Sequence, residues 1–196
     1  MNRILLLGGL LLSLASGCES PSTRQPAPAA PTPHSSTKPT VPVRLPDGAV
    51  RGDFDGDGTA EYVWLVPPQL DSTDANCVGA CTSYLTSSNP ALRPYALETA
   101  IDGTLTVYPH LGAGRRDYVG IAPAWFMGCW SRYFVLTYRP GGWQLGVAPF
   151  STHCDQWEKD SVAVSRDGAH PGHVLIHYTD MAAEDFAVKT KSVPLR

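Results

Sequence analysis

The densest group of metal-ligand side chains in this sequence is a short acidic stretch around residue 55. Asp53, Asp55 and Asp57 occupy alternate positions, and Glu61 follows in the sequence GDFDGDGTAE. Without a cation, carboxylates gathered in one tight loop would repel one another and raise each other's pKa values. Carboxylate oxygens suit hard cations, and Ca²⁺ accepts about six to eight oxygens in flexible geometry, whereas Mg²⁺ requires a stricter octahedron. The pattern therefore predicts a calcium site.

The loop itself supplies the predicted ligands. Gly56 and Gly58 allow the positive-φ turns that aim several oxygens at one point. The predicted ligands are four side-chain carboxylates and one backbone carbonyl, those of Asp53, Asp55, Asp57, Glu61 and Thr59. The alternative is an acidic, solvated turn without a metal.

The residues after the loop distinguish it from an EF-hand. An EF-hand needs an acid at loop position 12 and a helix leaving the site. Position 12 here is Trp64, and residues 62–66 form a β-branched and aromatic run that is typical of a strand. The stretch from Gly52 to Leu65 resembles the calcium loops of the FG-GAP and VCBS repeat families, in which a D-x-D-x-D-G-x-x-[DE] loop joins two strands of a propeller blade. The resemblance covers this loop alone.

The N-terminal residues predict export. Arg3 precedes the apolar run from Ile4 to Leu14, which fits a signal-peptide core and is too short to span a bilayer. Ala15-Ser16-Gly17-Cys18 then resembles the bacterial lipobox. The resemblance implies that residues 1–17 are a lipoprotein signal peptide and that Cys18 is lipidated, which would attach the chain to the membrane. Ordinary secretion with cleavage near the same point is the alternative.

A proline-rich segment separates Cys18 from the rest of the chain. Residues 19–46 contain eight of the 18 prolines and almost no large apolar side chain. Such a segment cannot bury enough surface to fold and favours extended polyproline II. We therefore expect residues 18–46 to be a lipidated, disordered linker and residues 47–196 to be the folded domain. Glu19, where lipoproteins retained at the inner membrane carry aspartate, favours the outer membrane or cell surface.

The composition of residues 47–196 excludes nucleic acid as a partner. They hold 11 of the 15 basic and 17 of the 18 acidic residues, which gives a net charge of about −6 without a basic stripe. Their four cysteines, in an exported protein, are expected to form disulfides. Three pairings are open, and we favour Cys77 with Cys81 and Cys129 with Cys154. The C-x-x-x-C spacing of the first pair does not support a thioredoxin-like motif.

An internal repeat supports a mainly β fold. GDGTAEYVWLVP at residues 56–67 aligns with GAGRRDYVGIAP at residues 112–123, with an offset of 56. A period of this size falls in the range of propeller-type repeats. The second copy lacks the aspartates, so we expect it to keep the turn, with Asp117 as a turn residue, and to lack the metal. The prediction is a small antiparallel β-sheet or sandwich, or a partial propeller-like domain. Further predicted strands are 83–86, 103–108, 131–138, 143–148, 161–165, 173–178 and 187–195.

Two groups of residues suggest alternative chemistry. Residues 151–155 place Ser151, His153 and Asp155 near one another, as in an exported hydrolase, but adjacent residues of a strand point to opposite faces. Three histidines with imidazoles suited to zinc form the second group, His170, His173 and His177.

An aromatic run is the remaining candidate for binding. Trp125, Phe126, Trp130, Tyr133 and Phe134 are more typical of a core than of a platform on which sugars stack. The sequence favours a calcium-stabilised, envelope-anchored binding or scaffolding module, with a protein or carbohydrate ligand, over an enzyme.

Overall fold

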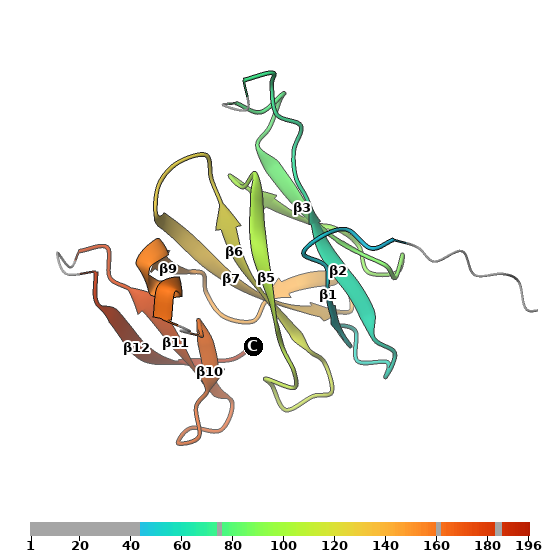
Figure 1. Ribbon diagram of the computed structural model, residues 1–196. Helices are drawn as coiled ribbons and strands as arrows, with labels where there is room; N and C mark the ends of the chain where they lie inside the picture. Colours follow the sequence, from blue (N-terminus) through green and yellow to red (C-terminus); the bar gives the residue numbers. More distant parts are fainter. Residues whose placement is uncertain (1–43, 74–75, 160–161, 183–185) are drawn as a thin grey trace, which may run out of the picture. The chain divides into compact units, whose positions relative to one another are not determined.

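The computed structural model describes residues 44–73, 76–159, 162–182 and 186–196. Three predicted features lie outside the described residues: the signal peptide, lipidation at Cys18 and the linker up to residue 43. Within the described residues the fold is mainly β, as predicted, and consists of three antiparallel sheets without an α-helix (Figure 1). No helix in this part of the chain is long and apolar enough to cross a bilayer.

The first sheet contains four strands in the order in which they occur along the chain. The strands are β1 (Val50–Gly52), β2 (Glu61–Val66), β3 (Thr82–Ser87) and β4 (Tyr95–Glu98). The predicted metal loop is the connection between β1 and β2. A strand therefore leaves the loop, which agrees with the distinction from an EF-hand.

The second and third sheets follow along the chain. The second sheet has the order β5-β6-β7-β8, and β9 pairs with the other part of β7. Its strands are β5 (Asp102–Tyr108), β6 (Tyr118–Ala124), β7 (Trp130–Arg139), β8 (Gly142–Leu145) and β9 (Phe150–His153). A 3₁₀-helix, η1 (Cys154–Lys159), then leads to the third sheet. Its strands are β10 (Val164–Arg166), β11 (His173–Thr179) and β12 (Val188–Pro194).

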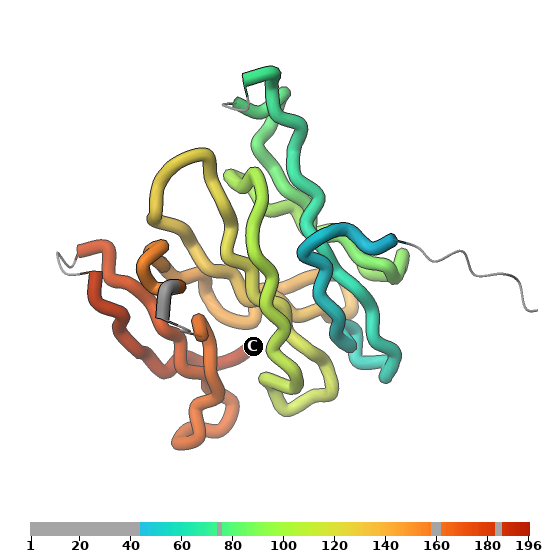
Figure 2. Tube along the Cα trace, in the orientation of Figure 1, coloured from blue at the N-terminus to red at the C-terminus, as the bar shows by residue number. Residues whose placement is uncertain are grey.

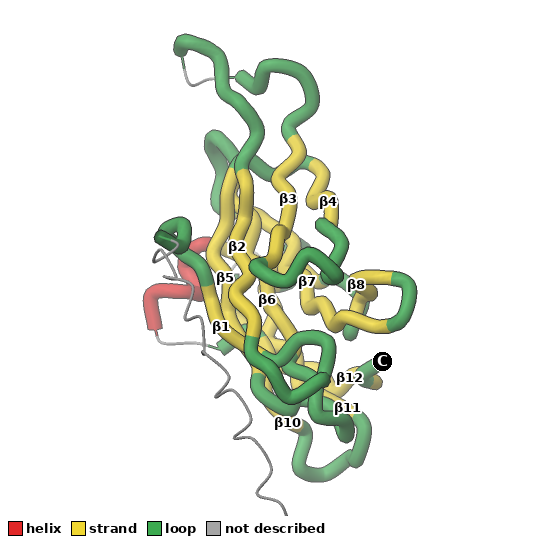
Figure 3. The backbone as a smooth tube through the Cα atoms, turned by 90° about the vertical axis from the view of Figure 1, so that its right-hand side faces the viewer, coloured by secondary structure: helices red, strands yellow, loops and turns green. Residues whose placement is uncertain are grey.

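The second sheet is the middle layer of the domain, because both of its faces are buried. On β6, Val119 and Ile121 belong to one apolar core, which also contains Phe54, Val63 and Leu85 of the first sheet and its loop. Figure 3 shows the first two sheets side by side. On the other face, Tyr118 of β6 belongs to a second core, whose remaining members include Tyr133, Val135, Val164, Val174 and Ile176. Strands buried on both faces read as continuous apolar runs, which explains the sequence YVGI in β6.

In the second core, two tyrosine side chains pack against the backbone of Gly120. The Tyr108 and Tyr133 hydroxyls lie 2.9 Å apart in a buried hydrogen bond beside Gly120 of β6. A Cβ at Gly120 would overlap with the Tyr133 hydroxyl. Only glycine leaves room for this tyrosine pair.

The sequence repeat corresponds to two equivalent hairpins. In the first, the Phe54 N–H donates to Glu61 Oε2 at 3.0 Å, and in the second the His110 N–H donates to Asp117 Oδ1 at 3.1 Å. Both pairs of residues are related by the predicted offset of 56. The second copy therefore keeps the turn with Asp117 at its base, as expected.

The structure contains the two predicted disulfides, Cys77–Cys81 and Cys129–Cys154. The first lies in the long connection between β2 and β3, which extends beyond the sheets (Figure 3). The second follows directly on the β7–β9 pairing of Trp130 with His153.

The last residues of the chain return to the middle sheet after β12 (Figure 2). The Arg196 N–H donates to the Gly146 carbonyl at 2.8 Å, and the Tyr118 hydroxyl donates to a backbone carboxyl oxygen of Arg196 at 3.2 Å. These two bonds fix the end of the chain against the second core.

Candidate metal centre

The loop between β1 and β2 brings the four predicted carboxylates to one point. Asp53, Asp55, Asp57 and Glu61 each offer an oxygen, and these oxygens all lie within 4.8 Å of one another. Gly56 and Gly58 have φ values of 80° and 92°, so the loop depends on the left-handed conformation at both glycines, as the sequence predicted.

Backbone N–H groups of the loop orient the aspartates. Asp53 accepts from Gly56 through Oδ1 at 2.8 Å and from Gly58 through Oδ2 at 3.1 Å. Asp55 Oδ1 accepts from the Asp57 N–H at 3.1 Å. Each of these oxygens retains a lone pair. The backbone thus positions the carboxylates and leaves them free to bind a cation.

Glu61 is the buried member of the cluster. Its side chain begins β2 and is 4% exposed. Oε2 accepts the Phe54 N–H, whereas Oε1 is buried without a hydrogen-bond partner. Burial, and secondly the negative charge of Asp55, raise the pKa of Glu61 above its usual range. A buried carboxylate oxygen without a partner is costly unless a cation or donor binds it. The donor set, all oxygen, fits a hard cation.

Residues in the turn before β6 form hydrogen bonds with the backbone of the loop. The Asp53 N–H donates to Asp117 Oδ2 at 2.9 Å, and the Asp117 N–H donates back to the Asp53 carbonyl at 2.8 Å. Arg116 Nε donates to the Asp55 carbonyl at 2.8 Å. The second hairpin, which lacks the aspartates, thereby supports the backbone of the first.

Three supporting residues were not predicted as part of the site. Asn89, which follows β3, donates to Asp55 Oδ2 at 3.2 Å. The repeat singled out Asp117, but only as a turn residue, and nothing in the sequence links Arg116 or Asn89 to the loop. Thr59, predicted to contribute its carbonyl, donates its N–H to Asp57 Oδ1 at 2.6 Å. Its role as a ligand stays a prediction.

Comparison with known proteins adds nothing to this geometry, because no family model, curated protein or solved structure matches the chain.

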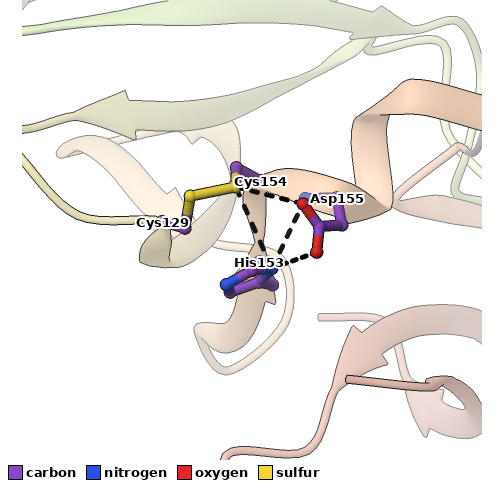
Figure 4. Close-up of a disulfide and its surroundings, with 4 residues drawn as sticks. All are labelled: Cys129, His153, Cys154 and Asp155. Atoms are coloured by element: carbon purple, nitrogen blue, oxygen red, sulfur yellow. Dashed lines mark hydrogen bonds and ion pairs between the residues drawn. A yellow bond between two sulfur atoms is a disulfide. The ribbon is translucent and has the colours of Figure 1, made fainter. Parts of the chain in front are cut away.

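The second cluster of chemically active side chains surrounds the Cys129–Cys154 disulfide (Figure 4). His153 Nδ1 lies 3.3 Å from Asp155 Oδ2 and 3.9 Å from Cys154 Sγ. The cysteine is oxidised and offers no thiolate. The Ser151 hydroxyl donates to the Thr179 carbonyl at 2.6 Å. The cluster therefore has a base and an acid but no available nucleophile.

Aromatic rings cover the imidazole of His153. Phe186 stacks on it with ring centroids 4.6 Å apart, and Trp130 contacts its edge at 4.9 Å. This packing accounts for the position of His153 between β7 and the segment before β12.

The three histidines of the zinc alternative do not converge. His170 and His173 lie at one turn, with ring centroids 5.9 Å apart. Both ring nitrogens of His177 are within 3.2 Å of hydroxyl groups on β10 and β12. The described residues give no site at which all three imidazoles meet one ion. His170 instead pairs with Asp167 at 2.8 Å.

The aromatic run divides between core and surface. Tyr133 is buried and Phe134 packs against the first core, as the core interpretation predicted. Trp125 and Trp130, however, are 43% and 36% exposed. Together with Met181 they line an open groove of about 760 Å³ beside β4. Trp125 directly follows the last residue of β6, and Trp130 is the first residue of β7.

Proposed function

We propose that this protein is a calcium-stabilised binding module attached to the bacterial envelope through lipidated Cys18. The metal loop fixes the junction of the first two sheets, and the ligand binds elsewhere on the domain. The proposal includes two further statements. The loop is a calcium loop of the FG-GAP or VCBS type, and the protein lies at the outer membrane or the cell surface.

The observation that carries the calcium proposal is the orphaned Oε1 of Glu61. This oxygen is buried without a hydrogen-bond partner, and the Glu61 carboxylate belongs to one cluster with three aspartate carboxylates. A bound Ca²⁺ would supply the missing positive charge, with Asp53, Asp55, Asp57, Glu61 and the Thr59 carbonyl as its protein ligands. Calcium suits the all-oxygen set because it tolerates irregular geometry and high coordination number.

Two further observations support a module over an enzyme. His153 lacks a free nucleophile, and the groove beside Trp125 and Trp130 offers an exposed surface of the kind that binding modules use. The two disulfides indicate an oxidising, extracytoplasmic compartment, which favours export.

Thermal unfolding with and without calcium tests the proposal. The protein carrying Cys18→Ser, so that no lipid is attached, is expected to gain about 1.4 kcal/mol at 1 mM Ca²⁺ for a dissociation constant of about 10⁻⁴ M. That corresponds to a rise in Tm of about 3 to 6 °C. Asp55→Ala with Asp57→Ala should remove the rise.

The matched control replaces two acidic residues outside the loop, Asp47→Ala with Asp102→Ala, and should keep the full response. An equal calcium response in the loop variant and the control would refute the site. Titration with Mg²⁺ and Zn²⁺ at the same concentrations identifies the cation, and a larger effect of either would exclude calcium as the preferred ion.

A further inference from the structure

A second pocket lies at the opposite end of β7 from the aromatic groove. It has a volume of about 350 Å³ and three arginines line it: Arg116 from the β5–β6 turn, Arg139 from the end of β7, and Arg196. Gly112 and Gly114 of the same turn form one wall. Segments distant in sequence therefore bring three positive charges to one small cavity.

Few groups among the described residues balance these charges. None of the three guanidinium groups forms an ion pair with a described side-chain carboxylate, and no acidic side chain lines the pocket. Arg116 donates to the Asp55 carbonyl, and the backbone carboxyl group of Arg196, which accepts from Tyr118, is the one negative group at the pocket among the described residues. The folded part carries a net charge of about −6, from 11 basic and 17 acidic residues, so acidic partners are abundant elsewhere. Three guanidinium groups against one backbone carboxyl group leave an excess of positive charge at this cavity of an acidic domain, and this excess indicates that the missing partner is an anion.

Backbone contacts hold the pocket in place. Arg116 donates through Nε to the Asp55 carbonyl, which leaves its two terminal nitrogens for a ligand. Its aliphatic stem packs beside Gly56. Arg196 is anchored through its backbone by Gly146 and Tyr118. A preorganised site loses less entropy when it binds its ligand.

We propose that this pocket binds a phosphate group. The guanidinium plane matches a phosphate bidentately, and a dianion satisfies more of the three positive charges than a single carboxylate does. The volume leaves room for an ester substituent, so the group belongs either to a small phosphorylated molecule or to a lipid headgroup. This inference is independent of the calcium proposal, although Arg116 touches both sites.

Calorimetric titration tests the pocket. Inorganic phosphate is added to the protein carrying Cys18→Ser in calcium-free buffer at constant ionic strength, with chloride as the reference anion. The expected result is saturable binding of phosphate. Arg139→Gln should weaken it about tenfold or more, and Arg139→Lys should retain part of the affinity. Arg139 forms no ion pair with any side chain of the described residues, so its variants should fold.

Arg93→Gln, at an exposed arginine outside the pocket, is the matched control and should bind like the wild type. A second arm replaces phosphate with phosphatidylcholine vesicles that contain phosphatidic acid. Binding of either probe that depends on Arg139 supports the site, and the arm in which it occurs identifies the source of the phosphate. Absence of binding in both arms, or equal binding by the Arg139→Gln and Arg93→Gln variants, would overturn the proposal. Because calcium is absent, neither result depends on metal binding by the loop.

Discussion

At the scale of single residues, Glu61 has the most unusual environment in the acidic loop. Its carboxylate is buried at the start of β2, and one oxygen has no partner. The side chains around it were predictable, because the spacing of three aspartates and a glutamate already implies a common focus. The burial of Glu61 was not predictable. It arises because the second sheet covers the loop, and no local pattern encodes that contact.

The raised pKa of Glu61 predicts a pH dependence for the calcium-free protein. Because the folded-state pKa is above the unfolded-state value, the folded protein binds more protons between the two values. The Glu61 contribution to stability is therefore full below the unfolded pKa and is lost as pH rises through the folded pKa. Glu61→Gln should remove this loss. The free energy of unfolding of the variant, relative to that of the wild type, should therefore increase with pH from about pH 4 upward.

Chemical denaturation at several pH values, without calcium, measures this difference. The same variant should bind calcium at least about tenfold more weakly, since it lacks a charged ligand. Glu98→Gln, at an exposed position of β4, serves as the control. A Glu61→Gln protein with the pH profile and calcium affinity of the wild type would contradict the assignment.

Gly120 gives a second prediction at this scale. Gly120→Ala places a methyl group against the hydrogen-bonded hydroxyls of Tyr108 and Tyr133, so the pair must separate or β6 must shift. We expect a loss of about 1–3 kcal/mol in the free energy of unfolding, as for other overpacked cores. Urea denaturation measures it, and Gly168→Ala, where a methyl group meets open space, should change stability by much less.

At the scale of elements, the sequence predicted most of the strands directly, indicated β6 only through the alignment of residues 112–123 with residues 56–67, and missed three short strands. The strands with alternating or continuous apolar residues, such as β5, β7 and β11, were identified, and the hairpin around Pro140-Gly141 is present with Tyr138 opposite Trp143. The missed strands are β1, β4 and β9, with three or four residues each. Segments this short have too few residues to show the alternation of apolar and polar side chains that is typical of a strand. They are strands because they form hydrogen bonds with neighbouring strands.

The two disulfides provide a prediction about elements. In the chain-entropy account, stabilisation grows with the length of the closed loop, and the sequence separations are 4 and 25 residues. Replacing Cys129 and Cys154 with serine should therefore cost about 3.5 kcal/mol, against about 2 kcal/mol for the same change at Cys77 and Cys81. Urea denaturation of the two double variants gives both values.

The comparison also tests whether the pairing of β7 with β9 restrains residues 129–154 when the disulfide is absent. A cost for the Cys129 and Cys154 variant no larger than that of the other pair would show that the four residue pairs between β7 and β9 already restrain this loop in the unfolded ensemble.

At the scale of the whole domain, the middle sheet couples two cores. Leu136 of β7 lies in the core shared with the first sheet, while Val135, its neighbour, lies in the core shared with the third. Neither outer sheet can lose its core without exposing one face of β6 and β7. The described domain should therefore unfold as one cooperative unit.

Leu136→Ala tests this coupling. The variant should lose about 2–5 kcal/mol, as for a fully buried leucine. If unfolding is cooperative, hydrogen exchange of the slowest amides should accelerate by similar factors in β3 and in β11, although Leu136 and the buried residues of β11 belong to different cores. Val162→Ala, at an exposed valine, is the control. Faster exchange confined to β3 would show that the two cores open separately.

The alternation along β6 and β7 has a consequence for how this chain can change over evolutionary time. Odd-numbered and even-numbered positions on these strands serve different interiors, because successive side chains point to opposite faces. A substitution at Val119 or Ile121 requires compensation only on the side of the acidic loop, whereas one at Tyr133 requires it only on the side of β10 and β11. Two lineages of this protein can thus diverge on one side of the middle sheet while the other side stays the same.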